Sequence, residues 1–270
     1  MQNLSFPSGH NRDTSQRHPV PQSGQVLLVT DTPASSAQFI VQALLQSQLK
    51  RESDTAGRGC ILVSVDDDLA HISAIASRSN LNLQNHLRAR SLVYVDGSQL
   101  TLSHTTTAQP GVIVCPLIDT SLRPLYDVIE CAFNDLAPTA AERLLVLGDI
   151  STLEWIDIPL VEIMRFVRAV RALAVRHEAG LVITYHSPTP TLPLESDVLR
   201  DLVMSCDIHV EVRELSSGLS SAVSGEVALH PGYTYPDPHL VPIPRERAIQ
   251  YRLTDNGAVW FERGTSAGVL

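Results

Sequence analysis

The feature that most constrains the fold of this 270-residue chain is the alternation of short apolar runs with stretches of helical periodicity. Continuous apolar runs are typical of strands that are buried on both faces. They occur at Gln25–Val29, Cys60–Val65, Ser91–Val95, Leu144–Leu147, Leu181–Tyr185 and Ile208–Val212. Gly111–Cys115 is a candidate for a further short strand. Helices are predicted between them, over Pro33–Lys50, Leu69–Ser77, Leu122–Leu136, Pro159–His177 and Asp197–Met204. Strands that alternate with helices predict an α/β fold with a mainly parallel sheet and helices on both faces.

The last part of the sequence has a different character. The runs Glu226–His230, Ile249–Leu253 and Val259–Glu262 predict strands with no helices between them, and the turn signal Asp255-Asn256-Gly257 joins the last two as a hairpin. We therefore expect antiparallel strands to extend the parallel sheet. Residues 1–23 are rich in polar residues and proline, which predicts a disordered tail before one domain over residues 24–270.

Charge and cysteine usage restrict the classes of function. The formal net charge is −9, and of the 20 basic residues all but Lys50 are arginine. An acidic chain is not expected to bind nucleic acid by itself, because such binders normally carry a basic surface. The four cysteines are widely spaced among apolar neighbours, which indicates reduced core thiols and a cytoplasmic or nuclear protein. No apolar stretch approaches the ~18 residues of a membrane helix.

The loop after the first predicted strand has the place of a nucleotide-binding P-loop. A P-loop needs glycines that let backbone N–H groups wrap a phosphate, and a lysine that reaches its oxygens. Here the two glycine positions, the lysine position and the magnesium-hydroxyl position hold Thr30, Ser35, Ser36 and Ala37. Lys50 is too far along the following helix to substitute. Two interpretations of this segment are left. It has weak anion affinity at a helix N-terminus, or it is a plain turn with Asp31 or Thr32 as the helix cap.

Carboxylates also follow two other strands. Leu144–Asp149 has the form of a Walker B strand, whose acid would hold magnesium, but without a phosphate clamp we favour a structural role for Asp149 as a cap of Ile150–Ser151. Asp66–Asp68 could bind a cation and more commonly begins a helix. The ten histidines show no metal-ligand spacing, so no metal and no cofactor is expected, and His186 is interpreted as polar lining at a strand end.

Two further segments are candidates for contacts with other molecules. The longest predicted helix carries arginines on one broad side, which is either a solvated face or a subunit interface: Arg165, Arg168, Arg171 and Arg176. The proline-rich loop Thr189–Glu195, with Thr189 and Leu192, follows a strand and could reach a partner or a central pore.

Several segments, in order along the chain, resemble the Elongator complex protein 6 family. They are the strand–turn–helix Val26–Leu45 with its Thr-Asp-Thr-Pro turn, Cys60–Asp66 with the helix near His71, Leu-Val-Leu-Gly-Asp-Ile-Ser-Thr-Leu-Glu-Trp at 145–155, and the ending Val-Trp-Phe-Glu-Arg-Gly-Thr-Ser-Ala-Gly-Val-Leu at 259–270. The resemblance implies a RecA-like fold, with the topology of P-loop ATPases and without the P-loop.

The resemblance also implies a function. Members of this family are non-catalytic subunits of a heterohexameric ring that contains two copies each of three related RecA-like subunits, the others being Elongator proteins 4 and 5. The ring is the accessory subassembly of the catalytic Elongator core, binds tRNA and serves modification of wobble uridine at carbon-5, in cytoplasm and nucleus.

Two other interpretations stay open. The chain could be an autonomous or regulatory nucleotide-binding RecA-like ATPase with a degenerate pocket around Ser35, Ser36 and Asp149. It could also be a pseudo-ATPase regulator of another recombinase-like ring, and only the identity of its partners would separate that from an Elongator subunit.

Overall fold

All ten strands of the described chain belong to one sheet. The computed structural model describes residues 21–50, 57–97, 109–115, 117, 120–187, 196–215, 218, 220, 222–233, 240–255 and 257–261. The strands are β1 Val26–Asp31, β2 Gly57–Ser64, β3 Leu92–Asp96, β4 Val112–Val114, β5 Ala140–Leu147, β6 Ala179–His186, β7 Ile208–Arg213, β8 Gly225–Pro231, β9 Ile249–Thr254 and β10 Gly257–Phe261. Of the expected tail, residues 1–20 lie outside this description.

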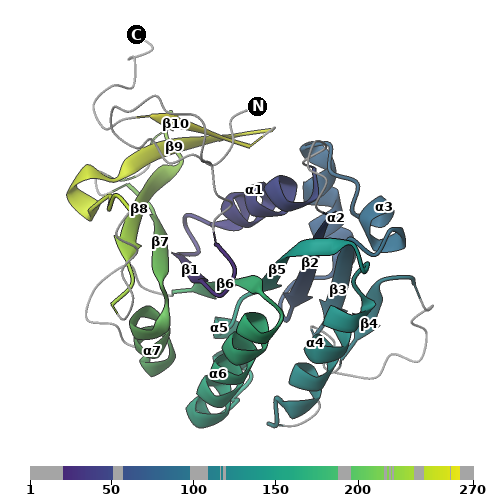
Figure 1. Ribbon diagram of the computed structural model, residues 1–270. Helices are drawn as coiled ribbons and strands as arrows, with labels where there is room; N and C mark the ends of the chain where they lie inside the picture. Colours follow the sequence, from purple (N-terminus) through teal and green to yellow (C-terminus); the bar gives the residue numbers. More distant parts are fainter. Residues whose placement is uncertain are drawn as a thin grey trace.

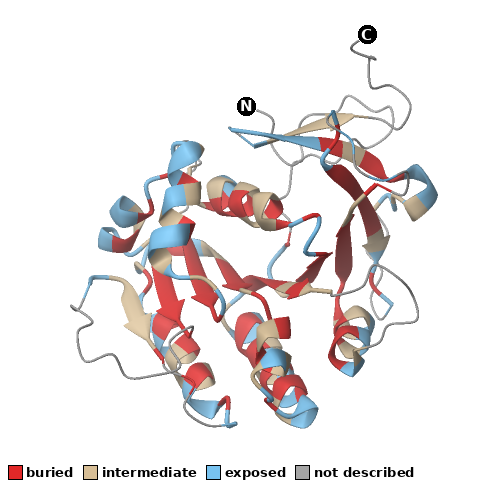
Figure 2. Cartoon of the chain, turned by 180° about the vertical axis from the view of Figure 1, so that it is seen from behind, coloured by how far each residue is buried: buried red, intermediate tan, exposed pale blue. Residues whose placement is uncertain are grey.

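The order of the strands is β10-β9-β8-β7-β1-β6-β5-β2-β3-β4. Neighbours from β7 to β4 pair in parallel, and β8, β9 and β10 add to β7 as an antiparallel extension (Figure 1). The expectation of a mainly parallel sheet with antiparallel C-terminal strands is confirmed. Strand β1 lies inside the sheet between β6 and β7, and all six of its residues are buried (Figure 2).

Helices cover both faces of the sheet (Figure 1). One face packs against α1 Gln38–Leu49, α2 Leu69–Arg78 and α3 Leu83–Arg88, and the other against α4 Arg123–Asp135, α5 Ser151–Trp155, α6 Leu160–Arg176 and α7 Asp197–Ser205. A short 3-10 helix, η1 Arg245–Arg247, precedes β9. Successive strand residues point to opposite faces, so neighbours such as Leu27 and Leu28 enter different apolar cores.

The structure corrects some local expectations. The first helix begins at Gln38 and not at Pro33, because residues 32–36 form a turn. Helices α3 and α5 were not predicted, since six and five residues are too few for a helical period to stand out. Cys131 is exposed, whereas Cys60, Cys115 and Cys206 are buried as expected. None of the described helices has the length and apolar character needed to cross a membrane.

Candidate functional site at the carboxyl edge of the sheet

The parallel strands bring their carboxyl ends to one edge, where open α/β sheets bind ligands. Asp31 ends β1 and lies in register with His186 at the end of β6. Asp149 follows β5, and Asp66 follows β2. The approach of these segments depends on Gly148, because a Cβ atom there would lie 2.9 Å from the carbonyl oxygen of Val63.

The N-terminus of α1, which would hold a phosphate in a P-loop protein, already holds a carboxylate of this chain. Asp31 is 3% exposed. Its Oδ2 accepts a hydrogen bond from the backbone N–H of Ala37 (2.5 Å), the residue before the helix, and its Oδ1 pairs with Nδ1 of His186. This pair, ahead of the opposing effect of burial, raises the pKa of His186 to about 9. The sheet edge thus carries an internal ion pair between the buried Asp31 and the half-exposed His186 where a nucleotide would place its phosphates.

The turn between β1 and α1 is closed on itself. The N–H of Ser35 donates to the carbonyl of Thr32 (2.9 Å), and the hydroxyl of Thr32 donates to Glu214 (2.6 Å) beyond β7. Ser35 is buried and donates to the carbonyl of Ser224, whereas the exposed Ser36 accepts from the N–H of Gln38. These contacts tie Thr32 and Ser35 to neighbouring segments of the fold.

Thr30, which the sequence analysis compared with a glycine of the P-loop, lies in β1 and points away from the turn. The hydroxyl of Thr30 lies 2.8 Å from Nε2 of His209 on β7, in the interior. Burial lowers the pKa of His209 to about 4, so its ring is neutral near pH 7. Of the four positions compared with a P-loop, Ala37 donates a hydrogen bond to Asp31 through its backbone N–H.

Asp149 lies just before the short helix α5, whose N-cap position is Ile150, and accepts hydrogen bonds from the first turn of that helix. Its Oδ1 accepts from the N–H groups of Ser151 (3.0 Å) and His186 (2.9 Å), and its Oδ2 accepts from the hydroxyls of Ser151 (2.6 Å) and Thr152 (3.1 Å). Four donors on a buried carboxylate leave little capacity for a metal ion. Asp68 caps α2, by accepting from the N–H of His71 (2.7 Å).

One cluster at this edge has the side chains for a metal ion. Ligand atoms of Asp66, Asp149 and His186 lie within 4.8 Å of one another. A metal ion would have to displace the proton of His186, whose pKa is about 9, and share Asp149 with its four donors. The arrangement suits a positive charge, and the imidazolium of His186 supplies one.

The single lysine lies far from this edge. Nζ of Lys50 contacts the carbonyl of Ser79 beyond the C-terminus of α1, as expected for a residue that cannot reach the turn before that helix.

The arginines of α6 divide into two groups. Arg171 donates to the carbonyl of Ser205 (2.6 Å), and Arg176 pairs with Glu130 of α4, so both join α6 to its neighbours. Arg165 and Arg168 are exposed, and Arg165 pairs with an acid of its own helix. Arg176 is exposed as well, so that three of the four predicted arginines face solvent and Arg171 is partly buried. Thr189 and Leu192 lie outside the described residues.

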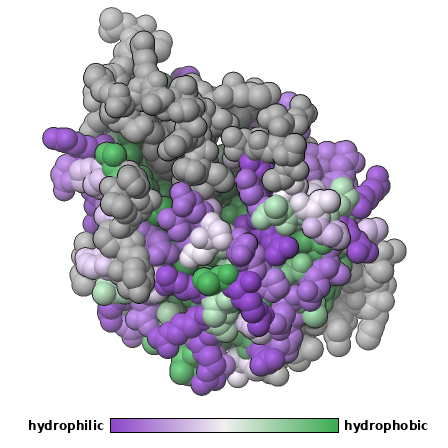
Figure 3. Space-filling view, viewed as in Figure 1, coloured by the Kyte–Doolittle hydropathy of each residue, from purple (hydrophilic) through white to green (hydrophobic). Residues whose placement is uncertain are grey.

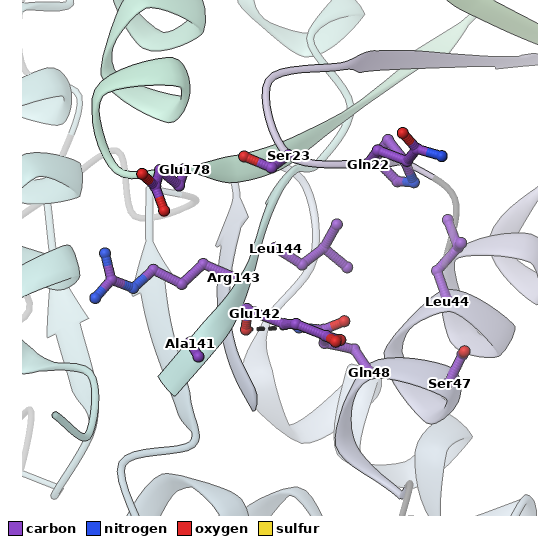
Figure 4. A pocket seen from close by; sticks show the side chains of 11 residues that line it. Gln22, Ser23, Leu44, Ser47, Gln48, Ala141, Glu142, Arg143, Leu144 and Glu178 are labelled. Carbon is purple, nitrogen blue, oxygen red and sulfur yellow. Dashed lines mark hydrogen bonds between the residues drawn. The ribbon is translucent and has the colours of Figure 1, made fainter. Parts of the chain in front are cut away.

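A small cavity opens at the opposite, amino edge of the sheet. It has a volume of about 150 Å³ and lies between the segment before β1, the start of β5 and the end of α1 (Figure 4). Gln48 lines this cavity and donates to the carbonyls of Gly59 and Glu142 (both 3.1 Å). The amide of Gln48 is therefore tied into the fold, and sequence analysis gave no indication of this cavity.

Sequence analysis also missed an ionic cluster around the buried Glu211 of β7, which contacts His230 of β8 and Arg245 of η1. Glu211 accepts two hydrogen bonds from Arg245 (2.7 and 2.8 Å) and lies 3.1 Å from His230. Although burial opposes it, the contacts with His230 and Arg245 lower the pKa of Glu211 to about 2. The only signal in the sequence is the alternation of His209, Glu211 and Arg213 along one face of β7.

Comparison with known proteins places the chain in a family. The model of the family Elongation complex protein 6 matches residues 12–255. The chain belongs to the Elongation complex protein 6 family. Elongator complex protein 6 of Xenopus tropicalis is 25% identical over 273 residues and covers 97% of both chains. Elongator complex protein 6 of Xenopus laevis is 24% identical over 258 residues, with 92% of this chain and 93% of its own covered.

A solved structure supports the fold of this Elongation complex protein 6 family member. An uncharacterised protein from Pyrococcus horikoshii, crystallised in complex with an unknown peptide, matches with a TM-score of 0.62 at 14% identity, over 90% of this chain and 94% of that chain. At this identity the likeness shows the fold alone. Together with the strand order, it confirms the expectation of a RecA-like α/β fold.

Proposed function

We propose that this chain is a non-catalytic subunit of the Elongator complex. The family match over residues 12–255 and the names of the two Xenopus relatives support membership of that complex. In the proposed assembly, the chain joins Elongator proteins 4 and 5, two related RecA-like subunits, in a heterohexameric ring with two copies of each. The ring binds to the catalytic Elongator core and supports modification of wobble uridine at carbon-5 of tRNA, in the cytoplasm and the nucleus.

The pair of Asp31 with His186 and Ala37 carries the non-catalytic part of this proposal. Phosphoryl transfer depends on cationic and backbone donors that surround the phosphates. Here the donor at the start of α1 is used by Asp31, and a phosphate at that place would meet a buried negative charge. We therefore propose that the chain contributes surfaces to the ring and hydrolyses no ATP by itself.

The proposed contact with tRNA is made by the assembled ring. A chain with net charge −9 is repelled by the phosphate backbone unless cations are concentrated locally. Arg165 and Arg168 on the outer face of α6 are exposed cations that could contribute to such a shared site. They are equally suited to a subunit interface, so substitution of both should be measured in the ring and not in the isolated chain.

Co-expression with Elongator proteins 4 and 5 tests the proposal. Purification through a tag on this chain, followed by native mass spectrometry, should give a complex with two copies of each subunit. The purified ring should bind tRNA, and an extract that lacks this chain should regain carbon-5 modification of wobble uridine when the chain is supplied. Recovery of a lone monomer with no affinity for either subunit would contradict the proposal.

An autonomous nucleotide-binding protein is the alternative, and one observation favours it: Asp66, Asp149 and His186 are close enough to hold a metal ion. This alternative predicts that magnesium and ATP together raise the melting temperature of the isolated chain. It also predicts that Asp149→Ala abolishes that increase. The Elongator proposal predicts the same melting temperature with and without the nucleotide.

A further inference from the structure

The turn between β1 and α1 is bonded to the C-terminal antiparallel strands, which lie far from it in the sequence. The hydroxyl of Thr32 donates to Glu214 (2.6 Å), just after β7. The hydroxyl of Ser35 donates to the carbonyl of Ser224 (3.4 Å), just before β8, and shares a hydrogen bond with the hydroxyl of Tyr251 on β9. The buried polar side chains of the turn are therefore satisfied by the last part of the chain.

An aromatic cluster extends this contact along the start of α1. The centre of the Phe39 ring lies 4.5 Å from that of Tyr251 and 5.9 Å from that of Trp260 on β10. Tyr251 is 1% exposed, whereas the described surface on the face shown in Figure 3 is mainly hydrophilic, with apolar residues in small separate groups. Gly225 leaves room for the Tyr251 hydroxyl, because a Cβ atom there would lie 2.8 Å from its oxygen. The tyrosine is thus enclosed, with its hydroxyl at the turn.

The outer hairpin, formed by β9 and β10, has few other attachments within the sheet. Strand β9 pairs with β8 over three residues, Gly225–Val227, and β10 is the edge strand beyond it. Because an isolated two-stranded hairpin is marginally stable in water, this hairpin depends on its packing against α1. The turn depends on the same region, since among the described residues every side-chain hydrogen bond of Thr32 and Ser35 goes to the C-terminal strands or to the segments that flank them.

We propose that the C-terminal antiparallel extension is an internal strap that holds the turn between β1 and α1 closed. In a P-loop protein, a bound phosphate holds the loop at this place through backbone N–H groups. Here the N–H groups of Ser35 and Ala37 are bonded to Thr32 and Asp31, in the conformation that the strap fixes. The hairpin and the turn open together, in one local unfolding event that leaves the parallel sheet intact. This coupling is a property of the single chain and does not require the partner subunits of the proposed function.

Hydrogen exchange of the full wild-type chain, followed by NMR at low urea concentrations, tests the strap. The N–H groups of Ser35 and Ala37 report on the turn. Those of Ser224 and Leu253 report on the hairpin, because they are bonded to the carbonyl of Tyr251 and to the hydroxyl of Ser224. All four should show one opening free energy and one dependence on urea, while amides of β5 should be about tenfold or more better protected. Different urea dependences in turn and hairpin would overturn the proposal, as would equal protection of turn and β5.

Substitutions in the hairpin test whether it controls the turn. Trp260→Ala removes packing against Phe39 and should speed exchange in the turn by about tenfold or more, with β5 unchanged. Tyr251→Phe keeps the packing and removes the hydroxyl at Ser35, so exchange in the turn should rise by about fivefold. Leu253→Ala is the matched control, because it removes an apolar side chain of the same hairpin that is 47% exposed. It should change exchange in the turn by less than about twofold.

Three outcomes with these variants would overturn the proposal. Faster exchange in the hairpin of Trp260→Ala with no change in the turn would show that the hairpin opens by itself. A uniform rise across hairpin, turn and β5 would show that they form a single unfolding unit. Equal effects of Leu253→Ala and Trp260→Ala would remove the role of the aromatic cluster. If Trp260→Ala does not fold, Tyr251→Phe provides the same comparison.

Discussion

The pair between Asp31 and His186 predicts a measurable loss of stability when Asp31 is replaced by alanine. The variant leaves the N–H of Ala37 without its acceptor, and loss of a helix-terminal acceptor costs about 0.5–2 kcal/mol. It also removes the charge partner of His186. The His186 side chain is 43% exposed, so solvent screening limits this contribution to about 1 kcal/mol. We expect a decrease of roughly 1.5–3 kcal/mol in the free energy of unfolding, which corresponds to about 3–12 °C in melting temperature.

Asp31→Asn is the matched control, because its amide oxygen can still accept from Ala37 while the negative charge is lost. Proton NMR titration of the histidine rings should show the pKa of His186 falling from about 9 toward the ordinary 6.5 in this variant. His186→Gln assigns the signal among the ten histidines. Because the folded pKa is raised, the stability that His186 protonation contributes is fully present below pH 6.5 and is lost as the pH rises through about 9.

Two results would refute this reasoning. A wild-type His186 that titrates near pH 6.5 would show that no ion pair exists in solution. An unchanged His186 titration in Asp31→Asn would show that another group holds the charge. Either result would remove the argument that an internal carboxylate occupies the N-terminus of α1.

Three other predictions concern the interior and the outer face of α6. Burial lowers the pKa of His209 to about 4, so the folded protein takes up this proton less readily than the unfolded chain. The free energy of unfolding, measured with urea, should therefore fall by about 3 kcal/mol as the pH is lowered from 6.5 to 4. His209→Gln should abolish most of that loss. Arg245→Leu should lower the free energy of unfolding by about 2–4 kcal/mol at pH 7, because it leaves Glu211 buried without its bidentate partner, and the deficit should shrink as acid protonates Glu211. Arg171→Ala should destabilise the isolated chain by about 1–2 kcal/mol in chemical denaturation, because Arg171 donates to the carbonyl of Ser205 on α7. Arg168→Ala should not, since Arg168 is exposed and has no such bond among the described contacts.

The strands were predictable because burial on both faces leaves a direct record in the sequence. The apolar run Gln25–Val29 falls largely within β1, and Leu181–Tyr185 lies within β6. Helix starts were less predictable, because Pro33 is typical of a first helical turn while the hydrogen bonds of the turn delay the helix to Gln38. The short α5 left no periodic signal.

The location of the site followed from topology, and its chemistry did not. Any parallel sheet brings the ends of its strands together, so Asp149 could be placed at this edge from the sequence. The contact of Asp31 with His186 joins residues 155 positions apart and depends on the register of β1 against β6.

The central claim is that the carboxyl edge of this chain holds an internal ion pair in place of a nucleotide. Isothermal titration calorimetry of the purified chain with ATP and magnesium tests it most directly. We predict no binding heat for the wild-type chain and none for Asp149→Ala. Magnesium-dependent binding to the wild-type chain that is lost in Asp149→Ala would contradict the account.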